Sequence, residues 1–377
     1  MEKIPYNKPF IAGNELAYIA DAVSRGQLSG DGDYTKKCHA WLENKLGIKK
    51  ILLTHSCTAA LEIAAILCDI ESGAEVIMPS YTFVSTANAF VLRGAKPVFV
   101  DIRPDTLNIN EKLIEQAITR KTKVIVPVHY AGVACEMDVI MDIAKKHNLM
   151  VVEDAAQGVD AYYKGRALGS IGDLGCFSFH ETKNFISGEG GAIAVNNPAL
   201  VRQTEIIREK GTNRAEFFRG EVDKYTWQSI GSSYLPSELI AAFLYAQLEC
   251  AEDITHKRLQ IWNRYNEELQ PLAQSGDIVL PHIPDNCKHN GHLFYCILKS
   301  MEVRERFLKF LKEKGILAIF HYIPLHLSPM AKKMHLNVDL PVSTDLANRI
   351  VRLPIFFMLS EEQQNYIITS VKEFFGK

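Results

Sequence analysis

The segment GCFSFHETKN, residues 175–184, with GEGG at 188–191 soon after it, decides how the rest of the chain is interpreted. Residues 175–179 are small or aromatic and lack helical periodicity, which predicts a short strand. Lys183 stands in the polar stretch after this strand, just before the glycine-rich turn. A lysine in such a place is most often a solvated loop charge. Ser178 and an acidic pair upstream favour a catalytic role for Lys183 instead.

The acidic pair, Glu153 and Asp154, ends an apolar segment that predicts another strand. Neighbouring residues of a strand point to opposite faces, so only one of the two carboxylates can face a ligand. An amine that forms a Schiff base, an acid for a pyridinium nitrogen and a hydroxyl for a phosphate are the groups that pyridoxal phosphate chemistry requires. Lys183, Asp154 and Ser178 are candidates for them. Asp154 has a simpler alternative role, as the N-cap of a helix beginning at Ala155.

Composition bounds the class of protein. The chain has 377 residues, of which 47% are hydrophobic and 23% charged, as is usual for soluble enzymes of two or three domains. The formal net charge of −2 predicts neither a nucleic-acid partner nor a membrane surface. The N-terminus lacks a signal-like apolar core, and no apolar run reaches about 18 residues. The eight cysteines lack CxxC spacing, which favours reduced thiols over disulfides or zinc. We therefore expect a cytoplasmic protein.

Short apolar segments alternate with amphipathic ones through the first half of the chain, which predicts a mostly parallel sheet covered on both faces. The predicted strands are 51–54, 75–78, 97–101, 123–128, 149–153, 175–179 and 192–195. The predicted helices are 14–25, 84–92, 110–118, 136–147 and 200–213, together with one that the segment 55–62 leads into and that ends near 68. Functional groups of such sheets collect at the carboxyl ends of strands. We therefore expect one crevice lined by residues 54–59, 80–83, 129–130, 154–157 and 178–183.

The second part of the chain follows another pattern. A helix from 237 to about 274 is expected to bridge a large α/β domain, residues 1–252, and a smaller C-terminal α+β domain, residues 253–377, with residues 1–30 packing near the active site. In the smaller domain we predict a strand at 292–298, a helix at 303–314, a strand at 317–320 and a helix at 361–375. The irregular, aromatic stretch 214–234 is of a length that is usually functional or mobile.

Two glycine- or hydroxyl-rich turns have alternative interpretations. The turn 26–32 either punctuates the chain or lines a pocket. The Ser and Thr residues in 54–59 are helix caps by default, but the same junction offers free backbone N–H groups for a phosphate.

The segments EDAAQ (153–157), GCFSFHETKN (175–184) and EGG (189–191) resemble the signatures of the DegT/DnrJ/StrS sugar aminotransferases. The similarity extends from the Leu28-Ser29-Gly30 turn to HYIPLH at 321–326. It implies PLP-dependent transferase fold type I, which is aspartate aminotransferase-like, with pyridoxal 5'-phosphate as cofactor and a homodimer with shared active sites.

The segments 127–138, 208–214 and 223–227 resemble those family members that aminate C4 of dTDP-4-keto-6-deoxyglucose with glutamate as donor, for surface polysaccharides. Whether the product is the galacto or the gluco epimer, and whether C3 or C4 is aminated, stays open. A sugar dehydratase of the same fold is disfavoured, because such relatives have histidine where Lys183 stands. A regulator that only binds the cofactor is disfavoured by the intact lysine and aspartate.

The resemblance also implies a role for each cofactor-binding residue. These are Lys183 for the Schiff base, Asp154 for the pyridine nitrogen, Gln157 for the 3′ oxygen, Ser178 with the amides of Thr58 and Ala59 for the phosphate, and Phe83 for stacking on the ring. The chain departs from the family at 231–235, where a Gly-x-Asn-x-Arg pattern is replaced and Ser233 takes the place of the asparagine. That asparagine usually reaches the neighbouring subunit's phosphate, so this contact is left open.

Four residues are expected near the substrate: Ser29, His180, Tyr322 and His326. For His180, a role in packing is an equal alternative. For Tyr322 and His326, in the loop after residue 320, the alternative is a purely structural role.

Aromatic residues in the 214–234 stretch, namely Phe217, Phe218 and Trp227, favour an interface or the core over a nucleotide stack. Pairing His129 with Cys135, or His321 with His326, does not give the spacing or the additional ligands of a metal site. No metal is expected.

Overall fold

The computed structural model describes residues 3–377, and a seven-stranded sheet lies at its centre in the order β1-β9-β8-β5-β4-β2-β3. Its strands are β1 (Ile51–Thr54), β2 (Glu75–Pro79), β3 (Lys96–Val100), β4 (Thr122–Ile125), β5 (Met150–Asp154), β8 (Leu174–Ser178) and β9 (Gly191–Val195). Only β9 runs against its neighbours, β1 and β8. The other pairings are parallel, which confirms the predicted mostly parallel sheet.

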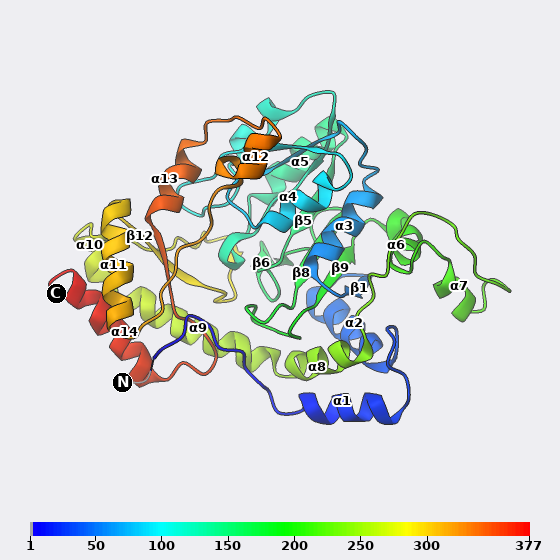
Figure 1. Ribbon diagram of the computed structural model, residues 1–377, viewed down its shortest axis with the longest axis horizontal. Coiled ribbons are helices and arrows are strands. Elements are labelled where there is room, and N and C mark those ends of the chain that lie inside the picture. Colours follow the sequence, from blue (N-terminus) through cyan, green and yellow to red (C-terminus); the bar gives the residue numbers. More distant parts are fainter. Residues whose placement is uncertain (1–2) are drawn as a thin grey trace.

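Helices cover both faces of this sheet (Figure 1). Those of this part of the chain are α1 (Glu15–Ser24), α2 (Asp33–Leu46), α3 (Cys57–Leu67), α4 (Val84–Val91), α5 (Met137–His147), α6 (Val201–Arg208), α7 (Arg214–Phe218) and α8 (Glu238–Glu249). Leu52 packs with α3 and α4 on one face, whereas Ile51 and Leu53 pack with α2 and α8 on the other. The strands are apolar on both sides because both sides are buried.

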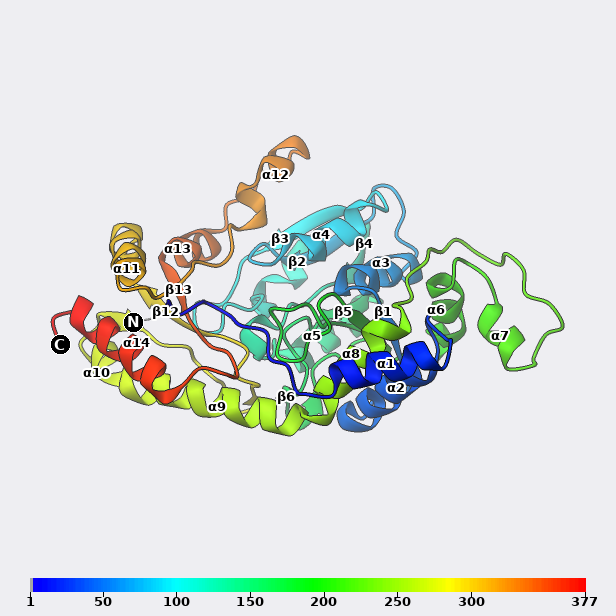
Figure 2. The same cartoon turned by 60° about the horizontal axis from the view of Figure 1, so that its bottom comes forward.

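The C-terminal part forms a smaller layer beside the sheet. It contains α9 (Ala251–Glu268), α10 (Gln270–Gln274), α11 (Met301–Glu313), α12 (Pro329–Lys333), α13 (Pro341–Arg349), α14 (Glu361–Phe374) and the antiparallel strands β10 (Ile278–Val279), β12 (Phe294–Leu298) and β13 (Ile350–Leu353). Figure 2 shows α8 and α9 running along one side of the molecule toward the C-terminal helices. A third, short sheet joins β6 (Tyr162–Tyr163), β7 (Arg166–Ala167) and β11 (Cys287–Lys288).

The N-terminal segment packs against the C-terminal layer. Ile4 is buried, its N–H donates to Gly315 O at 2.9 Å, and its carbonyl accepts from Leu317 N at 3.0 Å. Tyr6 lies two residues further on, at the edge of the cavity described below. The division at residue 252 stays a prediction, to which the structure adds this contact of the chain's beginning with its second half.

Two predicted elements are wrong, and the predicted helix 200–213 already ends at Arg208. Residues 110–118 form two 3₁₀ turns, Glu111–Leu113 and Glu115–Ala117, rather than an α-helix. Glu111 in the first turn and Ile114 between the two turns are buried, and their spacing of three residues matches the period of a 3₁₀ helix. Residues 317–320 make a single bridge, between Ile319 and Arg352, instead of a strand.

The stretch 211–234 extends away from the rest of the fold around α7 in both views (Figures 1 and 2). Several of its apolar side chains are exposed, among them Phe218 at 68% and Trp227 at 81%. Such exposed aromatic residues usually mark a surface that another molecule covers. Among residues 3–377, no helix is both long and apolar enough to cross a membrane.

Candidate active site

A cavity of about 650 Å³ lies at the carboxyl ends of the parallel strands, between the sheet and the C-terminal layer. Each of the five predicted strand ends contributes to its lining, through Thr58, Phe83, His129, Asp154 and Lys183 among others. The single crevice expected from the sequence is therefore present. The opposite wall comes from the C-terminal layer and the N-terminal segment, through Tyr6, Ile319, His321, Tyr322 and Arg352.

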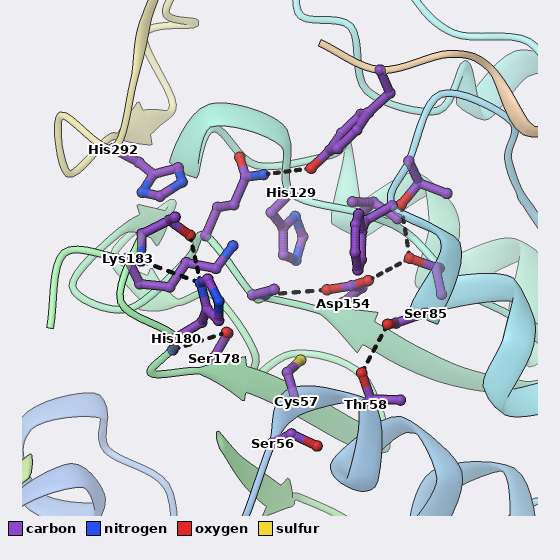
Figure 3. A pocket seen from close by; sticks show the side chains of 18 of the residues that line it. Ser56, Cys57, Thr58, Ser85, His129, Asp154, Ser178, His180, Lys183 and His292 are labelled. Atoms are coloured by element: carbon purple, nitrogen blue, oxygen red, sulfur yellow. Dashed lines mark hydrogen bonds between the residues drawn. The ribbon is translucent and has the colours of Figure 1, made fainter. Parts of the chain in front are cut away.

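Lys183 is held by a tight connection between β8 and β9. Phe179 N donates to Gly190 O at 2.8 Å, and Lys183 N donates to His180 O at 2.9 Å. The side chain extends into the cavity (Figure 3). Burial lowers the pKa of Lys183 below the ordinary value of a lysine, while Asp154 acts in the opposite direction. An amine with a lowered pKa is more often neutral and hence nucleophilic.

Asp154 lies at the end of β5, 5% exposed, and faces the same cavity. Its Oδ2 accepts from the Thr86 hydroxyl at 2.7 Å and its Oδ1 from Ala156 N at 3.2 Å. The bond to Ala156 N resembles the predicted cap, but no helix begins at Ala155. The carboxylate is thus fixed from two sides with a third direction open to the cavity, as a partner for a pyridinium nitrogen requires.

Glu153 points to the opposite face, as the strand geometry predicts. Its carboxylate accepts the backbone N–H groups of Gly169, Ile171 and Gly172 at 2.6–2.8 Å. It also bonds His129 Nε2 at 2.8 Å. Because His129 Nδ1 accepts from a backbone N–H, that of Cys135 at 3.2 Å, a neutral His129 carries its proton on Nε2 and donates it to Glu153. This bond fixes the His129 ring in the cavity wall.

The start of α3 and Ser178 form the predicted phosphate region. Ser56 caps α3, accepting from Ala59 N at 3.1 Å, so the cap interpretation is confirmed for this serine. The Ala59 amide is therefore already bonded, and Ala59 does not line the cavity. Thr58 does line it, with its hydroxyl 2.8 Å from Ser85 Oγ. Within the described part of the chain, the Ser178 hydroxyl accepts only a long bond of 3.4 Å, from His180 N.

Gly191 packs against the start of α3, at the edge of the predicted phosphate region. A Cβ atom at this position would lie 2.3 Å from the carbonyl carbon of Ser56 and 2.4 Å from Cys57 N. Only glycine allows β9 to begin this close to the start of α3. The glycine-rich turn thus has a packing function at the edge of the phosphate region.

Gln157 connects the two walls of the cavity. Its Oε1 accepts from Ala131 N at 2.7 Å, and its Nε2 donates to the Tyr322 hydroxyl at 3.2 Å. Burial raises the pKa of Tyr322, so this phenol stays protonated. Phe83, 57% exposed, lies at the rim with its ring centroid 6.3 Å from that of Tyr322. His180 also lines the cavity and bonds Thr182 Oγ1 at 2.9 Å.

Three predicted site residues lie elsewhere. His326 lies outside the cavity lining, where its ring nitrogens bond Ser80 at 2.7 Å and Thr344 at 3.2 Å, so its predicted contact with the substrate stays a prediction without support from this cavity. Ser29 is exposed and does not line the cavity of its own chain, so the 26–32 turn lies outside that pocket. Ser233 is exposed as well and pairs with Glu209 through a single backbone bridge.

The structure also brings in residues that the sequence did not assign to the site. They are Tyr6, Thr86, His292, His321 and Arg352. Burial and the nearby Lys183 lower the pKa of His321 to about 3, so this ring is neutral. His321 stands five residues before His326 in the segment HYIPLH, and the local sequence does not distinguish the two histidines. Nothing in the local pattern marks Arg352. Among residues 3–377, no group of three or more His, Cys, Asp or Glu side chains is arranged to hold a metal ion.

Comparison with known families gives the class of enzyme. The model of the DegT/DnrJ/EryC1/StrS aminotransferase family matches residues 9–372. The chain belongs to this family. Its fold is accordingly that of the PLP-dependent transferases of fold type I, as predicted, and its reaction class is sugar aminotransfer. Pyridoxal phosphate is the cofactor of the family.

Similar proteins within the family have varied names. The spore coat polysaccharide biosynthesis protein SpsC of Bacillus subtilis is 33% identical over 98% of this chain and 96% of its own. GDP-perosamine synthase of Escherichia coli O157:H7 is 31% identical over the whole of both chains. The PMP form of the sugar aminotransferase Spr1654 from Streptococcus pneumoniae superposes with a TM-score of 0.90 at 28% identity, covering 99% of this chain and 97% of that one.

The residues present fit the cofactor of the family. A lysine with a lowered pKa and a fixed aspartate share one cavity with an under-bonded serine hydroxyl and the start of a helix. These are the amine, the acid and the anion-binding groups that pyridoxal phosphate needs. The cavity volume of about 650 Å³ is in the range of cofactor sites.

Proposed function

We propose that this enzyme transfers the amino group of L-glutamate to C4 of dTDP-4-keto-6-deoxy-D-glucose. The products are 2-oxoglutarate and dTDP-4-amino-4,6-dideoxy-D-galactose, a precursor for surface polysaccharides of the enterobacterial common antigen or O-antigen type. The reaction class follows from the family, and the acceptor is supported by the resemblance carried by residues 127–138, 208–214 and 223–227. One observation carries the chemistry: Lys183 and Asp154 face a single cavity.

The cofactor would be held by residues from both sides of that cavity. Lys183 would bind it covalently, Asp154 would hold the ring nitrogen, and Ser178 with the Thr58 amide would hold the phosphate. Gln157 would donate to the ring's 3′ oxygen, and Phe83 would cover the ring. When bound, pyridoxal phosphate supplies an electron sink for the bond broken at the amino-bearing carbon.

Lys183 has a second task, the movement of protons. Its Nζ would take the proton from the amino-bearing carbon of the donor, and in the other half of the reaction it would deliver a proton to C4 of the sugar. The C–N bond of glutamate breaks and a C–N bond at C4 forms, so no external oxidant or reductant is needed. His180 and Tyr322 line the same cavity and are placed to contact the sugar.

The proposed assembly is a homodimer in the cytoplasm with sites at the subunit boundary. The exposed aromatic side chains of the 211–234 stretch, among them Trp227, support this proposal because exposed apolar surface of this kind usually packs against another molecule. Two-fold dimers are the commonest soluble assembly. Ser29 and Ser233 lie outside the cavity of their own chain, so any part they have at a site would come from the second copy.

The test is an assay of the product. Incubation with dTDP-4-keto-6-deoxyglucose and glutamate should give one amino sugar, whose H3–H4 and H4–H5 NMR couplings are small if the C4 amine is axial, as in the galacto product. Large couplings would identify the product as the gluco epimer. An amine at C3 would show that the enzyme aminates C3 rather than C4. GDP-4-keto-6-deoxymannose is the competing acceptor, because a 31% identical relative is named GDP-perosamine synthase. Faster turnover of that sugar would overturn the dTDP assignment.

A further inference from the structure

Thr82 and Thr86 form a short chain of hydroxyl groups that ends on Asp154. The Thr86 hydroxyl oxygen lies 2.7 Å from Asp154 Oδ2, and the Thr82 hydroxyl oxygen lies 2.7 Å from that of Thr86. All three side chains are buried, and all three line the active-site cavity. This chain of hydroxyl groups, hereafter the hydroxyl relay, therefore belongs to the wall of the cofactor cavity.

The direction of the two hydrogen bonds follows from the number of protons available. An ionised carboxylate only accepts, so the Thr86 hydroxyl donates its single proton to Asp154. The Thr86 oxygen then has only lone pairs left for Thr82, so Thr82 donates to Thr86. Both hydroxyl dipoles thus point their positive ends toward the carboxylate, and hydrogen bonds arranged in series strengthen one another.

Thr86 does not bond in the usual way of a threonine in a helix. Such a hydroxyl commonly donates to the carbonyl oxygen four residues before it, as Thr204 of α6 does to Leu200 O at 2.7 Å. In the first turn of α4, the Thr86 hydroxyl instead bonds the side chain four residues before it and a carboxylate from β5. The hydroxyl relay is thus directed at Asp154 rather than at the backbone of its own helix.

The relay provides the shorter of the two hydrogen bonds that hold the Asp154 carboxylate. The second comes from Ala156 N, which donates to Oδ1 at 3.2 Å. Both donors are neutral groups, and donors to a carboxylate favour its ionised form over its protonated form. Loss of the Thr86 hydroxyl would leave a buried carboxylate oxygen without the donor that it now has.

We propose that Thr86, supported by Thr82, keeps the shared proton on the ring nitrogen of the bound cofactor rather than on Asp154. This inference rests on the proposed contact between Asp154 and that nitrogen. A proton held between a carboxylate and a pyridine nitrogen belongs to the pair, and groups around the pair decide on which atom it lies. The protonated ring is the better electron sink. Thr82 and Thr86 are therefore positioning residues, which act on the reaction through Asp154.

The test locates the proton by NMR of the enzyme loaded with pyridoxal phosphate that carries nitrogen-15 in its ring. In wild type at neutral pH, the resonance should lie in the range of a protonated pyridine. Thr86→Val keeps the shape of the side chain and removes the hydroxyl. The ratio of the two proton positions should then change by about 10-fold or more, which moves the resonance toward that of a neutral pyridine.

Two further variants separate the hydroxyl from packing. Thr86→Ser retains the donor, so its resonance should stay close to that of wild type. Thr204→Val removes the hydroxyl of another buried helical threonine, outside the cavity lining, and is the matched control that should change nothing. A wild-type resonance typical of neutral pyridine, or an unmoved resonance in Thr86→Val, would overturn the proposal.

The donor half-reaction gives a second readout, by stopped-flow absorbance with glutamate alone. In Thr86→Val, kcat should fall about 10-fold or more while KM for glutamate changes less than about 3-fold, because the electron sink is weakened and donor binding is not. Thr82→Val removes only the outer link and should lower kcat less, by about 2-fold to 5-fold. Equal losses in Thr86→Val and Thr86→Ser would assign the effect to packing and contradict the relay.

Thr82→Val also covers the case in which Thr86→Val does not fold, because Thr82 lies in the loop before α4. Its nitrogen resonance should move in the same direction as expected for Thr86→Val, and an unmoved resonance would then decide against the relay. The NMR measurement needs no turnover. Failure of the proposed function, seen as no reaction of wild type with glutamate, is therefore distinguished from failure of this inference.

Discussion

Glu153 and Asp154 are consecutive residues of β5 whose carboxylates serve opposite faces of the sheet. Asp154 faces the cavity and is held by Thr86 and the Ala156 amide. Glu153 faces the packed side, where three backbone N–H groups and His129 bond it. The two neighbouring acids thus lie in different environments, Asp154 at the cavity and Glu153 in the packed side of the sheet.

Asp154→Asn should retain the fold and lose most of the activity. A neutral amide cannot hold a protonated ring nitrogen, and we expect kcat to fall by roughly 100-fold or more. Circular dichroism and thermal melting would establish that the variant is folded. Turnover within a factor of about three of wild type would show that Asp154 acts only as a local cap.

Glu153→Gln should behave in the opposite way. The amide side chain brings its own N–H donors to a site already filled by donors, so the free energy of unfolding should fall by about 2–4 kcal/mol. Thermal melting measures the effect. A protein as stable as wild type would contradict the structural role assigned to this carboxylate, and Asp154→Asn is the matched comparison one residue away.

Asp31 anchors the 26–32 turn to the sheet through Arg208, which donates two hydrogen bonds to it at 2.7 and 3.0 Å. Burial alone would raise the pKa of Asp31, but Arg208 outweighs it and lowers this pKa to about 2, below the 3.8 expected when unfolded. A lowered pKa adds stability above about pH 4 that is lost as the pH falls toward about 2. At pH 7, Asp31→Asn should therefore lower the free energy of unfolding by about 1–2 kcal/mol.

The difference between wild type and Asp31→Asn should shrink in acid, which urea unfolding at pH 7 and near pH 3 measures. Asp142→Asn, at an exposed position of α5, is the control and should show little change. A difference that stays constant over this range would mean that the ion pair with Arg208 is not its origin.

Shared sites predict complementation between inactive proteins. Lys183→Ala lacks the reactive amine, and Ser233→Trp would block a site across the boundary if the proposed dimer is correct. Mixed in equal amounts with random exchange, the two should recover roughly a quarter of wild-type activity, because half of the dimers then contain one intact site of two. Lack of recovery despite proven exchange, or a monomer by light scattering, would exclude shared sites.

Much of the fold was predictable because hydrophobic period and turn residues agree locally. The strands and all five cavity-forming ends follow from short apolar segments with polar residues after them. Helix α2 was not predicted, although Tyr34, Cys38, Leu42 and Leu46 form a buried stripe at i, i+4, i+8 and i+12, followed by Gly47. The local pattern of residues 110–118 predicts a helix, because it does not show which side chains the rest of the protein will hold in place.

The site was predictable where chemistry and motif coincide, as at Lys183 and Asp154. It was not predictable where tertiary packing decides. His326 and His321 stand five residues apart in one loop, and only the fold shows that the first bonds Ser80 while the second lines the cavity. Arg352 lies in an ordinary apolar strand, and only the placement of the neighbouring elements shows that its Nε is buried without a hydrogen-bond partner among residues 3–377.

The most direct test of the account is the reaction of the PLP-loaded enzyme with glutamate alone. Glutamate should shift the cofactor's visible absorbance band to that of the amine-loaded form, release one equivalent of 2-oxoglutarate, and remove the label that borohydride otherwise fixes on Lys183. Lys183→Ala should show none of these changes at a comparable rate. An unchanged spectrum in wild type, or a borohydride label on any other lysine, would contradict the claim that this cavity is an aminotransferase site built on Lys183.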